Sequence, residues 1–114
     1  MTKDDSAYLH HILDSISNID SFTEDMDEEE FKSNELVQSA VIRQIEIIGE
    51  ATKYLSDNTR VSYPNVAWKD IAGMRDKLIH GYFGVDIDAV WDTVKRDIPE
   101  LKEEIKRIID ELQQ

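Results

Sequence analysis

The sequence predicts an all-α protein, most simply an antiparallel bundle of four to five helices. Apolar residues recur at steps of three and four through most of the chain, which is the spacing of one helix face. No segment shows the sustained alternation of apolar and polar residues that is typical of a strand. Only 4 Gly and 2 Pro occur in 114 residues, so few breakers interrupt the periodic segments.

Two helices are expected in the first half of the chain. The first covers residues 5–19, and the second, which is longer, covers residues 34–56. The second carries two neighbouring apolar stripes, which together are wider than the usual amphipathic face of about 100°. Such a helix is either central in the bundle or shared between the core and a subunit interface. Residues 21–30 are acidic and lack apolar periodicity, so they form a loop or a short surface helix.

The second half of the chain is expected to add three helices. They cover residues 66–80, residues 86–97, and the chain from Pro99 to Leu112. Asn65 is the expected N-cap of the first of these, and Gly81 or Gly84 is its expected stop. Residues 57–65 form the connection that precedes it. The chain of residues 1–114 is long enough to bury one core, and we interpret it as a single domain.

Acidic residues dominate the two ends of the chain but not its middle. The net charge of −12 argues against a general nucleic-acid binder with a broad basic face. Residues 1–33 hold ten acids and two lysines, and residues 86–114 hold nine acids and five bases. Residues 34–85 hold six of each. An anionic ligand such as a phosphate is therefore expected in this neutral middle segment.

The composition also excludes several kinds of site. The absence of Cys removes disulfides, thiolate metal sites and cysteine nucleophiles, and it suits a reducing cytosol. The adjacent His10 and His11 point about 100° apart on a helix, so no shared metal is expected, and no cofactor is predicted. Residues 1–10 lack the apolar core of a secretory signal, and no window of about 18 apolar residues can span a membrane. The sequence therefore predicts a cytoplasmic protein without a membrane partner.

Reactive side chains gather between Arg75 and Tyr82. Arg75 offers a permanent positive charge and a forked donor that suits a phosphate and its transition state. His80 can move protons near neutral pH, and Asp76 can orient its imidazole. Tyr82 adds a phenol that can donate a hydrogen bond, stack on a base or be modified. An Arg and a His without a metal suit phosphodiester cleavage by an internal 2′-hydroxyl, which restricts the substrate to RNA.

The spacing of these residues favours a homodimer. On one straight helix Arg75 and His80 lie about 140° apart, so they do not converge well on a single substrate. A two-fold axis between two copies, or a break at Gly81, would allow one site to use both. The alternative is structural: Asp76 and His80 form a surface pair at i, i+4, and Tyr82 is a core aromatic.

Other polar and aromatic residues are assigned structural roles. Glu46 and Glu50 share a helix face without a His at ligand spacing, which favours a solvated or cleft-lining face over a metal site. Residues 27–30 are interpreted as a solvated acidic stretch. Trp68 and Trp91 are interpreted as packing residues rather than a stacking platform for RNA.

Four stretches of the sequence together resemble one known family. GMRDKLIHGY at residues 73–82 holds an arginine, an adjacent Asp, three further residues, His, one residue and Tyr. Its flanks are RQIEIIGEATKYL at 43–55, WKDI at 68–71 and FGVDIDAVWDTVKRDIPEL at 83–101. These stretches resemble the HepT toxin branch of the HEPN-superfamily ribonucleases. The resemblance covers most of the chain and is weakest over the first 35 residues.

The resemblance implies a helical bundle that works as a homodimer, with the motif at the interface in a composite cleft. Arg75 and His80 would be the catalytic pair of a metal-independent endoribonuclease, and Asp76 matches the polar residue that follows the arginine. Tyr82 matches a tyrosine that a cognate minimal nucleotidyltransferase antitoxin can adenylylate in this branch. The added AMP would place a bulky anion in the cleft and block RNA.

We therefore expect the toxin of a toxin–antitoxin pair, which cleaves RNA with Arg75 and His80 and is neutralised at Tyr82. The alternative is a non-catalytic module that binds nucleotide, or docks on a separate nucleotidyltransferase, through the same cleft. A structural adaptor is a third interpretation, and it leaves the clustered Arg, His and Tyr without a role. The acidity of the chain leaves open how RNA is held, and a cleft built from two neutral middle segments would answer this.

Overall fold

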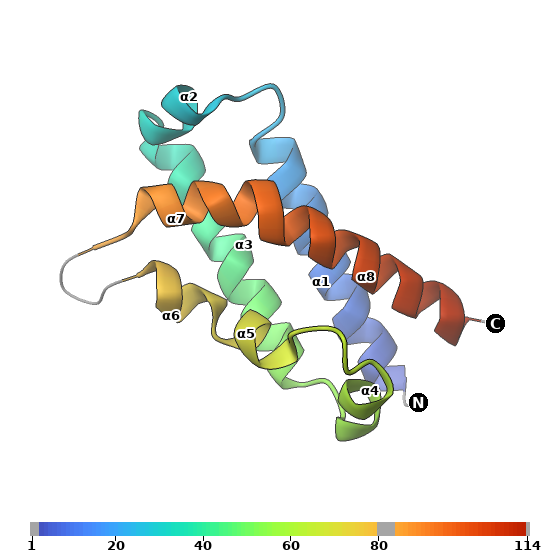
Figure 1. The fold of residues 1–114 in the computed structure, drawn as a ribbon. Helices are drawn as coiled ribbons and strands as arrows, with labels where there is room; N and C mark the ends of the chain where they lie inside the picture. Colours follow the sequence, from blue (N-terminus) through green and yellow to red (C-terminus); the bar gives the residue numbers. More distant parts are fainter. Residues whose placement is uncertain (1–2, 80–83, 114) are drawn as a thin grey trace.

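Two long antiparallel helices form the frame of the molecule. The structure is a computed structural model that describes residues 3–79 and 84–113. In it α1 (Lys3–Phe22) and α3 (Glu35–Lys53) lie side by side (Figure 1). Asn34 caps the start of α3, because its side chain accepts a hydrogen bond from the backbone N–H of Val37. Both helices therefore lie where the apolar periodicity predicted them.

A helical rod crosses this pair (Figure 1). It consists of α7 (Ile87–Asp92), a π-helical turn (Thr93–Asp97) and α8 (Ile98–Leu112). Pro99 was expected to open a separate helix, but it lies in the first turn of α8 and the rod runs through it. Proline is compatible with this position when the carbonyl one turn earlier is displaced, as it is in a π-helical turn.

Short helices make up most of the remaining chain. They are α2 (Glu28–Lys32), α4 (Asp57–Ser62), α5 (Trp68–Ala72) and α6 (Met74–Leu78). The all-α prediction is confirmed, and the described residues contain no β-structure beyond one bridge between Ile79 and Val85. None of the described helices is long and apolar enough to cross a bilayer.

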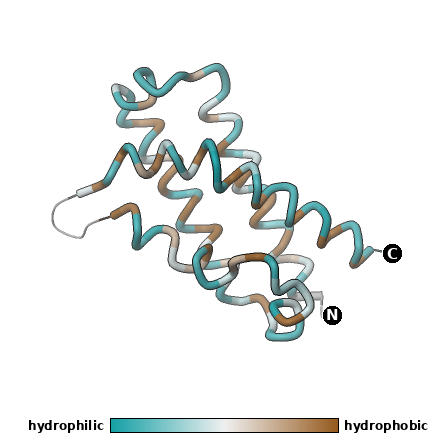
Figure 2. Tube along the Cα trace, in the orientation of Figure 1, coloured by the Kyte–Doolittle hydropathy of each residue, from teal (hydrophilic) through white to brown (hydrophobic). Residues whose placement is uncertain are grey.

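The core lies where α1, α3 and the rod meet. Figure 2 shows apolar positions recurring along each of these helices, with polar positions between them. The largest fully buried side chains come from all three, and they include Leu9, Ile12, Ile16, Ile19, Val41, Ile45, Ile48, Ile98, Ile105 and Ile108. The second apolar stripe of α3 is less uniform. Ala51 is buried and Ile47 is half-buried, whereas Tyr54, the residue directly after the helix, is 63% exposed. The wide apolar surface of α3 therefore serves mainly the core and is partly open to the outside.

The acidic stretch at residues 27–30 has a structural role that its composition did not predict. The Asp27 carboxylate accepts a hydrogen bond from the Glu30 backbone at 2.8 Å, and the Glu30 carboxylate accepts one from the Asp27 backbone at 3.2 Å. This capping box starts α2, which carries the fully buried Phe31 into contact with Trp91. The interpretation as a solvated stretch with a short surface helix is confirmed, since all four acids are exposed, and two of their carboxylates also hold backbone donors.

The segment expected to be one helix over residues 66–80 is two short helices. Gly73 separates α5 from α6, and glycine is the residue least able to hold a helix interior apart from proline. Asn65 is not the N-cap, because α5 begins at Trp68 after Ala67. Helix α6 ends at Leu78, since the backbone of Ile79 is already extended. A further helix, α4, occupies the expected connection.

Asp5 fastens α4 to α1. Its carboxylate, only 1% exposed, accepts hydrogen bonds from the Ser56 backbone at 3.0 Å and from Thr59 Oγ1 at 2.6 Å. Burial by itself would raise the pKa of Asp5, but these hydrogen bonds outweigh it and hold the pKa below its ordinary value. The ionised carboxylate is therefore the form that the fold stabilises.

Asp5→Ala is expected to lower the free energy of unfolding at pH 7 by about 2–3 kcal/mol, because buried donors lose their acceptor. Since the pKa of Asp5 is lowered on folding, this contribution is present above about pH 4 and is lost as the pH falls through the folded-state value. Chemical denaturation from pH 7 to pH 3 should show the difference from wild type shrinking. Asp14→Ala, an exposed acid on α1, is the control. A difference that does not change with pH would contradict this role.

Candidate active site

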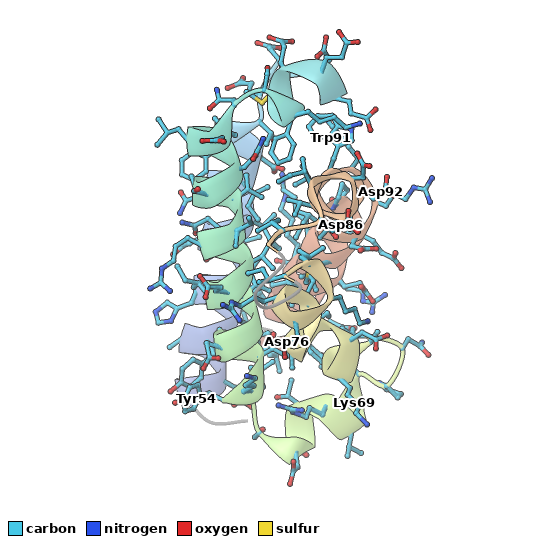
Figure 3. All side chains as sticks on the ribbon, turned by 90° about the vertical axis from the view of Figure 1, so that its left-hand side faces the viewer. Tyr54, Lys69, Asp76, Asp86, Trp91 and Asp92 are labelled. Carbon is cyan, nitrogen blue, oxygen red and sulfur yellow. The ribbon has the colours of Figure 1, made fainter. Side chains whose placement is uncertain are left out.

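A close approach between α3 and α5 places α6 beside α3. A Cβ atom added at Gly49 would lie 3.1 Å from the backbone oxygen of Ala72, so only glycine allows this contact without a shift. Gly73 follows at once, and α6 begins at Met74. Figure 3 shows the result, with Asp76 lying next to the C-terminal half of α3. The chemistry-bearing part of the chain is thus positioned against the long helix.

Glu46 of α3 holds Arg75 of α6. The Nε of Arg75 forms an ion pair with Oε2 of Glu46 at 2.8 Å. The other oxygen of Glu46 lies 4.0 Å from Nη1 of Arg43, one turn earlier on α3. The Arg75 side chain is 46% exposed, so the ion pair adds little to stability. The consequence of this ion pair is the orientation of Arg75. Glu46 lies at the Nε side of the guanidinium, and Asp76 lies 3.7 Å from Nη1. Nη2 has no partner among the described residues and can donate to an anion.

The two residues border a cleft of about 360 Å³ between α3 and the α5–α6 segment. Its lining holds three cationic side chains, Arg43, Lys53 and Arg75, and three acidic ones, Glu46, Glu50 and Asp76. All of them belong to the electrically neutral middle of the chain. Because Lys53 and Glu50 pair at 3.2 Å and Arg75 pairs with Glu46, the charges are largely compensated within the cleft. A phosphate can enter here without the repulsion that the acidic ends of the chain would impose.

The sequence-predicted site residues divide into two groups. Arg75 and Asp76 both line the cleft, and Asp76 Oδ1 lies 3.7 Å from Nη1 of Arg75. His80 and Tyr82 lie outside the residues that the structure describes. The expectation that one straight helix carries Arg75 and His80 was wrong, because α6 ends at Leu78. The angle of about 140° between them on such a helix therefore does not apply.

Glu46 is the functional candidate whose role sequence reasoning missed. The helix spacing of Glu46 and Glu50 predicted a cleft-lining face, and both residues do line the cleft. Glu46 and Arg75 belong to different helices and are 29 positions apart in the sequence, so no local pattern could reveal their pairing. Lys53 was likewise not expected as a cleft cation.

Comparisons with known proteins agree on one family. The family model described as "Ribonuclease HepT-like" matches residues 12–108. A "Putative RNase" of Methanocaldococcus jannaschii is 49% identical, and the match covers 98% of this chain and 97% of that protein. A "Probable ribonuclease HepT" of Thermococcus cleftensis is 43% identical over 95% of this chain and 98% of its own length.

One relative is longer than this chain. The "Gamma-glutamylcyclotransferase and putative RNase" of Methanocaldococcus jannaschii is 52% identical, and this chain spans half of its length. No solved structure matches the chain. The resemblance drawn from the four sequence stretches is confirmed by the family match over most of the chain. The chain belongs to the HepT-like ribonuclease family.

Proposed function

We propose that this protein is a metal-independent endoribonuclease that acts as the toxin of a toxin–antitoxin pair in the cytoplasm, with Arg75 and His80 as its catalytic residues. The observation that carries the proposal is the ion pair between Glu46 and Arg75 at the edge of a charge-balanced cleft. The ribonuclease names of the relatives support the substrate class. Arg75 binds the scissile phosphate of RNA and stabilises the charge that develops on it.

The chemistry divides between two side chains. The 2′-hydroxyl of RNA attacks the neighbouring phosphorus, and the 5′-oxygen of the next nucleotide leaves. His80 accepts the proton of the 2′-hydroxyl or donates the proton that the leaving oxygen needs, because a histidine side chain can move protons near neutral pH. Water carries the other proton, and the products are a 2′,3′-cyclic phosphate and a free 5′-hydroxyl. Arg75 needs no proton transfer, since its guanidinium is permanently charged. Asp76, beside Arg75 on α6, supports the site as a neighbouring carboxylate.

The outward face of α3 supports the proposal of a homodimer. Its residues recur at steps of four and three, which is the spacing of a helix–helix seam, and they are Leu36, Ala40, Arg43, Ile47, Glu50 and Tyr54. Leu36 is 81% exposed, and Tyr54, whose ring stacks on Tyr8 of α1, is 63% exposed, so both side chains are accessible to a partner. A second copy is the occupant that this face fits best.

The face is complementary to itself when two α3 helices run antiparallel. With Ile47 at the two-fold axis, Arg43 lies opposite Glu50 of the partner subunit, and the reverse pair forms at the same time. The cleft shares Arg43 and Glu50 with this face. Two neutral clefts would therefore adjoin across the axis, giving RNA a composite site away from the acidic ends of the chain.

Charge exchange on α3 tests the dimer. Arg43→Glu is expected to weaken dimerisation on the order of tenfold, because each acid then faces another acid. The double variant Arg43→Glu/Glu50→Arg is expected to recover it, since the pairs reform with reversed charge. Sedimentation equilibrium measures both, and Lys106→Glu on α8 is the control for net charge. Equal dimerisation of the Arg43→Glu variant and wild type would rule out this interface.

Regulation is proposed at Tyr82. A cognate minimal nucleotidyltransferase would transfer AMP to its phenol, and the added anion would compete with RNA for the cleft. The alternative function is a non-catalytic module that uses the same cleft to bind a nucleotide or to dock on a nucleotidyltransferase. The charge balance and the volume of the cleft, about 360 Å³, fit a phosphate group of RNA or of a free nucleotide.

RNA cleavage in excess EDTA separates these proposals. Wild-type protein is expected to cut RNA without a metal, and His80→Ala is expected to lose cleavage roughly 10²–10⁴-fold while keeping its fold. Circular dichroism checks the fold at equal concentration. If neither protein cuts tRNA, mRNA or total RNA and Tyr82 is unmodified by mass, the binding module replaces the enzyme.

A further inference from the structure

A second cavity lies on the opposite side of α6 from the cleft. It has a volume of about 250 Å³ and is bounded by α5, α6 and the rod from Thr93 to Glu104. Met74 and Leu78 line this cavity, whereas Arg75 and Asp76 of the same helix line the cleft. The proposed ribonuclease function uses none of the cavity's residues.

The cavity combines an apolar floor with an acidic rim. The apolar side chains are Ala67, Ile71, Met74, Leu78 and Leu101, and the acidic ones are Asp70, Asp97, Glu100 and Glu104. One cation is present among its lining residues, Lys77, and Asp70 already pairs with it at 3.5 Å. Among the described residues, no hydrogen-bond or salt-bridge partner is found for the other three carboxylates. The cavity therefore has a large excess of negative charge over an apolar surface.

The three unpaired carboxylates form a row rather than a cluster. Asp97, Glu100 and Glu104 lie on successive turns of the rod, so their backbones are about 4.5 and 6 Å apart along its axis. Among the described residues, no group of three potential ligands converges closely enough to hold a metal ion. A row of separated negative charges matches a chain of separated positive charges better than it matches one compact cation.

We propose that this cavity binds a linear aliphatic polyamine. Its ammonium groups would pair with the row of carboxylates, and its methylene stretches would cover the apolar floor. A divalent cation would need converging oxygen ligands, and a lysine side chain of another protein would bring only one ammonium group.

Two further features of the wall are relevant to ligand binding. Burial, and then the negative charge of Glu100, raises the pKa of Glu104, although the nearby Arg107 acts in the opposite direction. A bound ammonium group would offset the repulsion between the two carboxylates. The π-helical turn contributes Thr93 and Asp97 to the wall, and such turns frequently occur at functional sites.

Calorimetric titration of the full-length protein with spermidine, without RNA, tests the proposal. The pair Glu100→Gln/Glu104→Gln is expected to weaken binding on the order of tenfold. The matched pair Glu103→Gln/Asp110→Asn changes the net charge equally on exposed positions of the same helix and is expected to bind like wild type. Putrescine, with one methylene stretch, is expected to bind more weakly than spermidine.

Three results would overturn the polyamine site. The first is an absence of spermidine binding at physiological salt. The second is equal weakening by both pairs of substitutions, which would mean that spermidine is attracted only to the general acidity of the protein. The third is Mg²⁺ binding with the same affinity and the same sensitivity to Glu100 and Glu104, which would identify a simple cation site.

Discussion

Arg75→Ala is expected to lower RNA cleavage by roughly 10²–10³-fold with little loss of stability. The guanidinium is half-exposed and held by Glu46, so its removal leaves no buried cavity. What is lost is the donor that binds the phosphate and stabilises its developing charge. Arg75→Lys keeps the charge but not the fork, so it should recover only part of the activity. Single-turnover cleavage of a short RNA measures both variants.

Glu46→Gln tests whether the orientation of Arg75, rather than its charge alone, matters for cleavage. The carboxylate holds Arg75 Nε at 2.8 Å, and an amide would hold it less firmly. Cleavage is expected to fall about tenfold while Arg75 itself remains, since misplacement of a binding group reduces the rate. Glu103→Gln, an exposed change on α8, is the control for Glu46→Gln.

Lys69→Ala, an exposed change on α5 (Figure 3), is the control for Arg75→Ala. If Arg75→Ala cleaved RNA at the rate of this control, Arg75 would not belong to the catalytic pair.

Gly49→Val is expected to damage both stability and activity. Its Cβ would lie 3.1 Å from the Ala72 carbonyl oxygen, and two further methyl groups must also fit between α3 and α5. We expect a loss of about 1–3 kcal/mol in the free energy of unfolding, as for other overpacked contacts. Because α6 follows α5 directly, the displacement should also separate Arg75 from Glu46 and lower cleavage at least tenfold in the folded protein.

Gly49→Ala provides the graded control for this effect. It adds only the Cβ atom, and the gain in helix propensity, about 1 kcal/mol, opposes the tight contact. Its net effect on stability should therefore be small. Denaturation curves, and cleavage measured where each variant is fully folded, distinguish the two losses. If Gly49→Val cleaved RNA at the wild-type rate, the approach of α3 and α5 would not be what positions Arg75.

The helical class and the core were predictable because they depend on local periodicity. The apolar steps in α1, α3 and α8 identify which side of each helix is buried, whatever the partner. The second stripe of α3 raised the choice between core and interface, and its exposed Tyr54 now favours the interface. Short elements were harder, since α2 and α4 each carry too few residues for a periodic signal.

Local residue patterns were enough to predict the all-α class, the buried helix faces and the neutral segment in which an anion site was expected. They did not predict that Gly73 divides the motif-bearing helix, that α6 ends at Leu78, or that Glu46 pairs with Arg75. Periodicity is a property of neighbouring residues, whereas a side-chain pair across two helices depends on how closely their backbones approach, and here that distance depends on the missing side chain of Gly49.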